Sequence, residues 1–375
     1  MVEALNRDNV VVGCVITSQP GQYPLMQIYG ESLPSVPGMR ANEFVKFRVN
    51  GIPVVANPSL YWRNDSTQHT VDLALGSVAG QCRYLSPAWN LMSFQLRPTA
   101  PPVNDVLRSI KERYCKVFGE LGIYDCAIDP TYHTLKELQP GLSYWLQVTG
   151  TTGINLRVEG VPTAITTPLP LHRYWNWVGY LPTGTLPITA ALSSIAGHYQ
   201  MVLSFDKTYV PNDLEGSTLW TMEPGQGYQI LATDAVTLTY PLTSTGNIAL
   251  PNAPTRSDAC PSLAPRPDFM LLRGQLTVDG APAPAGSRVE IVTPRGETAG
   301  CFVIQHDGVL GYTRVFGEDQ SIGAAGFHTG DRLSFRVDGR SAVSSQPIEW
   351  RSDLATVPVD LIVSAFRVYL PIAFK

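Results

Sequence analysis

The side chains that most often carry out catalysis are present in this chain, but they do not gather in the sequence. No two histidines share the short spacing at which proteins hold a zinc ion, and Gly-x-Ser-x-Gly, P-loop and Gly-x-Gly-x-x-Gly motifs are absent from the sequence. The six histidines are His69, His133, His172, His198, His306 and His328. We therefore expect a protein that is not an enzyme.

One loop brings together the oxygen atoms that calcium prefers as ligands. Asp206, Asp213 and Glu215 lie close together in the sequence, and calcium binds carboxylate oxygens. The loop lacks the alternating acidic spacing of an EF-hand, so a solvated acidic loop is the simpler interpretation. We expect no cofactor, with calcium at this loop as the alternative.

Two of the six cysteines are placed to form a disulfide bond across a turn. Cys115 and Cys126 flank a short turn at residues 120–122, and two strands joined by that turn would bring them opposite each other. This spacing predicts a cross-strand disulfide bond. Such bonds are typical of proteins outside the reducing cytosol.

The other four cysteines leave several pairings open. Cys82 and Cys260 lie in linkers that flank the middle of the chain. They could pair with each other, or with Cys14 and Cys301 respectively. Without a partner, Cys14 and Cys301 are expected to be small buried side chains on strands that face the core.

Exposed tryptophan rings could bind a polysaccharide by stacking on its sugar rings. Trp89 and Trp175 occupy equivalent positions of a repeat described below, and we expect both in the core. Trp145 and Trp177 have no tryptophan at the matching position of the other copy. These two rings are therefore the better candidates for a surface that binds glycans.

All of these residues are carried by repeated segments. Five short blocks near the N-terminus recur near the C-terminus in the same order. The offset is 287 residues between Cys14 and Cys301, and 288 residues between Trp62 and Trp350. The blocks are GCVI at 13 and GCFV at 300, MQIYGE at 26 and TRVFGE at 313, FRVNG at 47 and FRVDG at 335, the two tryptophans, and VDL at 71 and 359.

A second pair of repeats lies between the first two. Trp89-Asn90 recurs as Trp175-Asn176, and Pro140-Gly141 recurs as Pro224-Gly225. Proline-rich linkers, which are stiff and extended, separate the repeats. The chain therefore predicts four tandem modules in the order A–B–B–A, with A1 at 1–77, B1 at 84–160, B2 at 172–242 and A2 at 268–363.

Hydrophobic patterning predicts the fold of each module. In the A modules, apolar and polar residues alternate between Asn-Gly and Asp-Gly turns, which predicts a small antiparallel β-sandwich with Trp62 or Trp350 in its core. In B1, the spacing predicts a helix over 103–114 and a one-turn helix over 134–138 among strands, so the B modules are expected to be α+β. Only 15% of the residues are charged, and glycine and proline are frequent. The chain is therefore expected to be mainly β.

The composition also bears on partners and location. The net charge is −4 and no run of Lys or Arg occurs, so nucleic acid is not an expected partner. No apolar segment is long enough to span a bilayer, and no signal peptide pattern is present, so membrane insertion is not expected either. Low charge, many aromatic residues and cysteines placed in strands and linkers still favour an extracellular protein.

The two ends of the chain predict self-assembly. By the offset of 287, module A1 has no counterpart of residues 271–278, the predicted opening strand of A2, so A1 would expose an open sheet edge. The segment 364–375 after A2 is apolar and about as long as that strand. Donated to the next copy, it would gain main-chain hydrogen bonds and side-chain pockets and build a homopolymer. Its candidate contact residues are Phe366, Val368, Tyr369, Leu370 and Ile372.

Two alternatives to polymerisation stay open at this point. The opening strand of A1 has been cut off, or the segment 364–375 pairs within its own module. Pro371 interrupts the segment and has to lie at an edge or a bulge of any sheet that it joins.

The A blocks resemble Ig-like modules in secreted surface proteins of filamentous Chloroflexus-type bacteria. The B blocks look like companion modules of those proteins, and Tyr369-Leu370-Pro371-Ile372 is similar to their chain endings. The resemblance implies Ig-like β-sandwiches in a cell-surface role without a reaction. We therefore expect a structural subunit of a filament or sheath. A monomeric surface adhesin or polysaccharide-binding protein is the alternative.

Overall fold

The computed structural model of the chain describes residues 1–17, 21–31, 37–74, 79–242 and 260–364. These residues form a mainly β protein, which confirms the prediction from composition. No helix in these segments is long and apolar enough to cross a lipid bilayer. Each described sheet takes its strands from one of four stretches. We call them the N-terminal region (2–74), the first central region (79–162), the second central region (169–238) and the C-terminal region (269–363).

The N-terminal region is a five-stranded antiparallel sheet in the order β2-β1-β3-β4-β5. Its core gathers apolar side chains from these strands and from the loops that cross over them. The strands are β1 (Val2–Leu5), β2 (Val11–Val15), β3 (Lys46–Val49), β4 (Ile52–Asn57) and β5 (Asp72–Ala74).

The first central region contains two sheets, in the orders β10-β9-β11-β7 and β6-β12-β8. Apolar side chains from both sheets share one core. The strands are β6 (Ala79–Leu85), β7 (Ala88–Met92), β8 (Leu96–Pro98), β9 (Tyr114–Gly119), β10 (Gly122–Asp125), β11 (Tyr144–Val148) and β12 (Ile154–Pro162). A 3₁₀ turn, η2 (Pro130–Tyr132), follows β10.

The helix predicted over 103–114 is much shorter in the structure. α1 (Val103–Val106) is followed by a 3₁₀ turn, η1 (Arg108–Ile110). The chain leaves helical geometry at Lys111, which has a ψ of 139°, and β9 begins at Tyr114 after Glu112 with a φ of 67°. The prediction was wrong about length because the apolar spacing continued into a strand.

The one-turn helix predicted over 134–138 is absent from the structure, where these residues contain no helical turn. The amide of Leu138 donates to the carbonyl of Pro101, and the amide of Leu135 donates to the carbonyl of Ile123. Hydrogen bonds to distant segments thus replace the bonds that a helix would have formed within itself.

The second central region is built along similar lines. Its sheets have the orders β14-β19-β16-β17, β13-β20 and β15-β18. The strands are β13 (Leu169–Leu171), β14 (Tyr174–Gly179), β15 (Leu186–Pro187), β16 (Tyr199–Leu203), β17 (Thr208–Tyr209), β18 (Thr221–Met222), β19 (Gly227–Ala232) and β20 (Val236–Leu238). A short α2 (Ile188–Ala191) and a 3₁₀ turn, η3 (Ser193–Ile195), follow β15.

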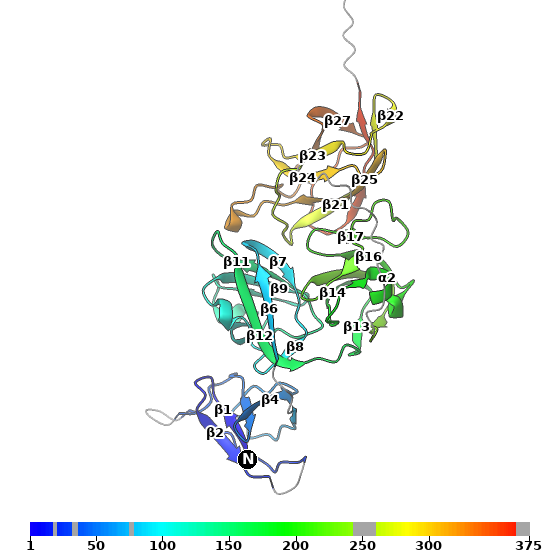
Figure 1. Cartoon of the computed structure of the whole chain (residues 1–375). Helices are drawn as coiled ribbons and strands as arrows, with labels where there is room; N and C mark the ends of the chain where they lie inside the picture. Colours follow the sequence, from blue (N-terminus) through cyan, green and yellow to red (C-terminus); the bar gives the residue numbers. More distant parts are fainter. Residues whose placement is uncertain (18–20, 32–36, 75–78, 243–259, 365–375) are drawn as a thin grey trace, which may run out of the picture.

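The two central regions lie side by side in the middle of the molecule (Figure 1). The amide of Ser93 donates to the carbonyl of Gly225, and the amide of Gly179 donates to the carbonyl of Gly141, both at 2.9 Å. By the offset of 86 residues, Ser93 is equivalent to Gly179. By the offset of 84 residues, Gly141 is equivalent to Gly225. The two regions therefore pack around an approximate two-fold axis.

The C-terminal region is organised by one long strand, β21 (Phe269–Val278). The first half of β21 pairs antiparallel with β25 and parallel with β28, and its second half pairs with β22 and β29. The other strands are β22 (Ala281–Pro282), β23 (Arg288–Val292), β24 (Thr298–Val303), β25 (Val309–Phe316), β26 (Ser334–Val337), β27 (Arg340–Ser344), β28 (Thr356–Pro358) and β29 (Leu361–Val363), with a 3₁₀ turn, η5 (Gln320–Ile322).

The outer face of β21 attaches the C-terminal region to the second central region. Phe269 and Leu271 pack against Met201 and Leu203. The buried guanidinium of Arg314 donates to the carbonyls of residues 204, 205 and 207. Because this site is buried, the pKa of Arg314 falls to about 10.

An ion pair adds a pH-dependent contribution to the same contact. Arg273 Nε donates to Asp213 Oδ2 at 2.6 Å, and this bond holds the pKa of Asp213 below its ordinary value. Stability from a carboxylate with a lowered pKa is present above the ordinary pKa and is lost as the pH falls through the lowered one. We expect Arg273→Leu to cost about 1–3 kcal/mol at pH 7 and much less near pH 2, measured by urea unfolding.

A matched control tests whether the contribution of the Arg273–Asp213 ion pair to the free energy of unfolding depends on its burial. Arg340 pairs with Asp279 at 3.1 Å, but both side chains are more than 40% exposed. Arg340→Leu should therefore change the unfolding free energy by less than about 0.5 kcal/mol. Equal losses in the two variants would show that the attachment to the second central region contributes nothing.

Candidate functional site

The N-terminal and C-terminal regions share contacts at the positions that the repeat makes equivalent. Trp62 Nε1 donates to the carbonyl of Ile28 at 3.0 Å, and Trp350 Nε1 donates to the carbonyl of Val315 at 2.9 Å. In both regions a glycine of the Gly-Glu block lies against that tryptophan ring. The sequence offset therefore maps positions of one region onto the other in space.

The described part of the N-terminal region has no strand in the place of β21. By the offset, the counterparts of β25 and β28 are residues 22–29 and 68–70. These two segments form walls of a groove with a volume of about 740 Å³. In the C-terminal region, the same place holds Met270 and Leu272 of β21, which belong to the core. The N-terminal region therefore presents a strand-shaped opening, which we call the strand groove.

Side chains that pack with β21 in one copy are less buried in the other. Trp350 is 2% exposed and Val315 is fully buried. Their counterparts Trp62 and Ile28 are only half-buried and line the strand groove. The floor of the groove is therefore apolar and ready to pack against an added strand.

The outer rim of the groove is also apolar. Leu25 is 73% exposed and Tyr29 is 62% exposed. Their counterparts in the C-terminal region, Tyr312 and Phe316, pack against the second central region instead. A strand added to the groove would therefore lie beside the exposed apolar side chains of Leu25 and Tyr29.

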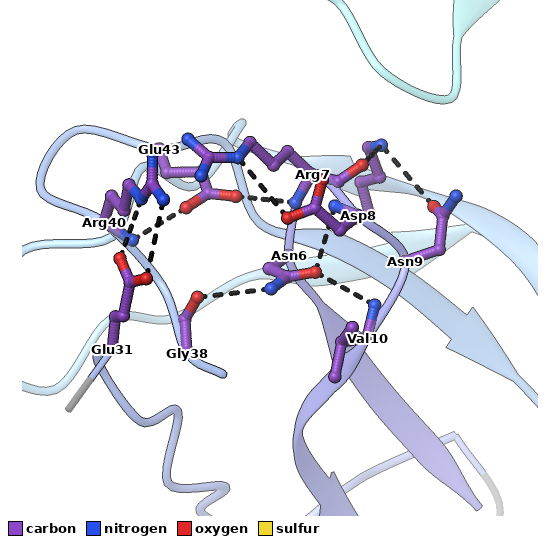
Figure 2. A network of polar contacts seen from close by, with 10 residues as sticks. Asn6, Arg7, Asp8, Asn9, Val10, Glu31, Gly38, Arg40 and Glu43 are labelled. Carbon is purple, nitrogen blue, oxygen red and sulfur yellow. Dashed lines mark hydrogen bonds and ion pairs between the residues drawn. The ribbon is translucent and has the colours of Figure 1, made fainter. Parts of the chain in front are cut away.

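A polar network lies close in sequence to the groove, around Glu31, Arg40 and Glu43 (Figure 2). Arg40 Nε donates to Glu31 Oε2 at 2.7 Å, and the same guanidinium holds the pKa of Glu31 below its ordinary value. Glu43 accepts hydrogen bonds from the amides of Arg7 and Arg40. The buried amide of Asn6 donates to the carbonyl of Gly38. These contacts tie the segment that follows Tyr29 to the turn after β1.

Tyr23 bridges the groove between its two walls. Its hydroxyl donates to the carbonyl of Val71 at 2.5 Å, which joins the two walls of the groove. Burial, together with the negative charge of Asp72, raises the pKa of Tyr23, so the hydroxyl keeps its proton at neutral pH. The phenol therefore crosses the path that a strand like β21 would follow, while Gly21 and Gln22 continue the lining beyond it.

No protein family model matches the chain, and no curated protein is significantly similar to it. The strand groove must therefore be interpreted from its own contacts. Its walls are chain segments outside the regular strands, at residues 23–29 and 68–70, and its floor is apolar. In the described part of the chain, the only group of three metal-binding side chains includes Cys115 and Cys126, which are bonded to each other.

The structure places the predicted disulfide residues as follows. Cys115 and Cys126 form a disulfide bond with their Cα atoms 4.8 Å apart. Cys260 is bonded to Cys301, one of the open alternatives. Cys82 is exposed and unbonded on β6, so it pairs with neither of its two candidate partners.

Cys14 is exposed, which corrects the expectation that it faces the core. The pairing of β1 with β2 shifts at Val12, because Ala4 faces Gly13 while Leu5 faces Val11. This bulge changes the alternation along β2, so the following inward residue is Val15. A bulge of this kind leaves no mark in the hydrophobic pattern.

Trp145 does not face solvent, which corrects its prediction as a glycan-binding ring. It is fully buried on the inner strand β11, and the ring of Phe205 from the second central region covers it at 5.9 Å. Trp177 is half-buried and packs against the same cluster. The structure brings the two rings together, but inside the contact between the central regions.

The last two predicted features are the acidic loop at residues 206–215 and the donor segment 364–375. Asp213 is engaged by Arg273, and in the described part of the chain the carboxylates of Asp206, Asp213 and Glu215 do not converge as a group of metal ligands. The donor residues predicted in the segment 364–375 lie outside the described residues, apart from Ser364.

Sequence reasoning predicted an open sheet edge in the N-terminal region, which stays a prediction, and it did not single out the residue that shapes the groove. Tyr23 matches Leu310 by the offset, and an aromatic in place of an aliphatic side chain is unremarkable in a sequence. The one available signal was its place opposite the missing strand, since Leu310 pairs with Gly274 of β21.

Proposed function

We propose that this protein is a non-enzymatic structural subunit of an extracellular filament or sheath that assembles head to tail. The strand groove of one copy accepts residues 365–375 of the next copy. The observation that carries the proposal is the groove itself, since β21 fills the equivalent place in the C-terminal region. A strand that enters gains main-chain hydrogen bonds and apolar contacts together.

The positions of the two ends support a chain of copies rather than a closed pair. The N-terminal region lies at one end of the molecule, and β29 ends at Val363 in the C-terminal region at the opposite end (Figure 1). Contacts between two different surfaces do not close on themselves unless a rotation forms a ring. Head-to-tail contacts between the ends of an elongated subunit therefore favour a filament.

The sequence of the segment suits the first half of β21. Val368 and Leu370 have the alternate spacing of the two core positions of β21 that precede Gly274. In that alignment Pro371 takes the place of Arg273, where the pairing of β21 with β25 is interrupted. Proline is tolerated at such irregular points of a sheet. The donated strand runs antiparallel to residues 22–29 and parallel to residues 68–70, as β21 does to their counterparts.

The architecture and location form part of the same proposal. We interpret the four regions as an A–B–B–A series in which Ig-like β-sandwiches flank two α+β modules. The two disulfide bonds support an oxidising compartment, as outside the cell. The alternative of a glycan-binding adhesin has lost one of its two candidate rings, because Trp145 is buried.

Truncation tests the proposal directly. The full chain and a chain ending at Ser364 are compared by sedimentation velocity over a hundredfold concentration range and by negative-stain electron microscopy. We expect the full chain to form filaments and the truncated chain to stay monomeric. A synthetic peptide of residues 364–375 should bind the truncated chain and shorten filaments of the full chain. The same peptide with Val368 and Leu370 replaced by aspartate is the matched control.

Two results would overturn the proposal. One is a full chain that stays monomeric and a peptide that does not bind, which would favour a monomeric surface adhesin. The other is a truncation that lowers the unfolding temperature of the C-terminal region without changing self-association. That outcome would mean that the segment pairs within its own copy.

A further inference from the structure

The strand β21 can cross the C-terminal region only because it carries a glycine. A Cβ atom on Gly274 would lie 1.7 Å from the carbonyl oxygen of Val359. On its other side, Gly274 pairs with Leu310 of β25. The strand therefore passes through a gap between these two residues that admits a backbone without a side chain.

In the N-terminal region a side chain closes the equivalent gap. Tyr23 and Val71 are the counterparts of Leu310 and Val359. The hydroxyl of Tyr23 donates to the carbonyl oxygen of Val71 at 2.5 Å, the counterpart of the oxygen that touches Gly274. The phenol thus reaches across the place that the glycine backbone occupies in the other copy.

We infer that Tyr23 determines the specificity of the strand groove by acting as its end stop. It limits the groove to a short strand that starts beside Tyr29 and ends before the gap, and it excludes a strand that continues along the path of β21. The inference rests on the proposed function and defines the partner. The partner is an extended segment with two apolar residues in alternate positions and no need for a glycine.

The segment 365–375 meets these requirements. It contains no glycine, so it could not follow β21 through a gap like that at Gly274. In the alignment above, Pro371 is the last residue before the gap, so the donated strand ends there and residues 372–375, with the predicted contact residue Ile372, leave the path of β21; a proline suits a strand that ends. The end stop and the absence of glycine in the segment therefore agree, although they come from opposite ends of the chain.

Two peptides test this inference on the chain ending at Ser364. One is residues 364–375, and the other is residues 266–278, which include β21 with Gly274. The proteins are the unchanged truncated chain, Tyr23→Ala, which opens the gap, and Tyr23→Phe, which keeps the ring but loses the hydrogen bond to Val71. Affinities are measured by fluorescence anisotropy. Hydrogen exchange of residues 22–29 and 67–71 reports whether a bound peptide lies in the groove, and circular dichroism checks the fold of each variant.

We expect the unchanged chain to bind the 364–375 peptide at least about tenfold more tightly than the 266–278 peptide. Tyr23→Ala should raise the affinity for 266–278 by about tenfold or more and change the affinity for 364–375 by less than about threefold. Tyr23→Phe should lie between the two, because the ring still blocks part of the gap.

The outcomes separate this inference from the proposed function. If 364–375 binds the groove but Tyr23→Ala leaves the selectivity unchanged, the end stop is overturned and head-to-tail assembly stands. Tighter binding of 266–278 than of 364–375 to the unchanged chain also overturns the end stop. If neither peptide binds any of the proteins, both the inference and the proposed function fail.

Discussion

Gly274→Ala is expected to destabilise the C-terminal region more than any other single methyl group added to the chain. The new Cβ atom would lie 1.7 Å from a backbone oxygen, Val359 O, which is fixed by the amide of Val359 donating to Arg273 at 2.9 Å. Neither strand can move without breaking the pairing of β21 with its neighbours. We expect a loss of at least about 3 kcal/mol in the free energy of unfolding, measured by urea denaturation followed by tryptophan fluorescence.

Gly280→Ala is the matched control for this prediction. Gly280 follows the same strand and has a φ of 85°, but a Cβ atom there would meet nothing within 4 Å. Its replacement should therefore cost only about 1 kcal/mol, from backbone strain alone. Equal costs at the two positions would mean that the gap relaxes easily. The steric basis of the Tyr23 end stop would then be lost as well.

The repeats made much of the architecture predictable. The offset read from Cys14 and Trp62 maps the hydrogen bond of each tryptophan ring onto the same acceptor position in both copies. By the same offset, the strand groove lies at the place that β21 fills in the C-terminal region. The opening strand predicted at 271–278 likewise corresponds to β21.

What could not be predicted depended on packing between distant segments. Trp145 had no tryptophan counterpart and was therefore assigned to the surface, but Phe205 of the other central region covers it. The spacing over 103–114 was helical, yet α1 ends at Val106, where Leu107 already has a φ of −91° and a ψ of 10°. The role of Tyr23 depends on its hydrogen bond to Val71, which is forty-eight residues away in the sequence. Such pairings leave no periodic signal in one sequence.

A charge on the floor of the strand groove should abolish self-assembly. Met26 is half-buried and lines the groove. Its counterpart, Thr313, is 1% exposed and pairs with Leu272 of β21. An occupying strand would bury the carboxylate of Met26→Asp against Leu370 without a partner. Burying an unpaired charge costs about 3 kcal/mol or more, so the 364–375 peptide should bind at least about 100-fold more weakly and filaments should disappear.

Gln27→Asp provides the matched control for the same strand. Gln27 is adjacent to Met26 but is exposed, and its counterpart Arg314 points toward the second central region rather than into the core. An aspartate there stays in water whether or not the groove is filled, so assembly and peptide binding should stay within about threefold of the unchanged chain. Sedimentation velocity and peptide anisotropy on both variants decide the matter. If Met26→Asp still assembles, copies join through a surface other than the groove. If neither variant assembles or binds the peptide, the added charge acts from outside the groove. Burial of the Met26→Asp carboxylate under a bound strand would then not explain the loss of assembly.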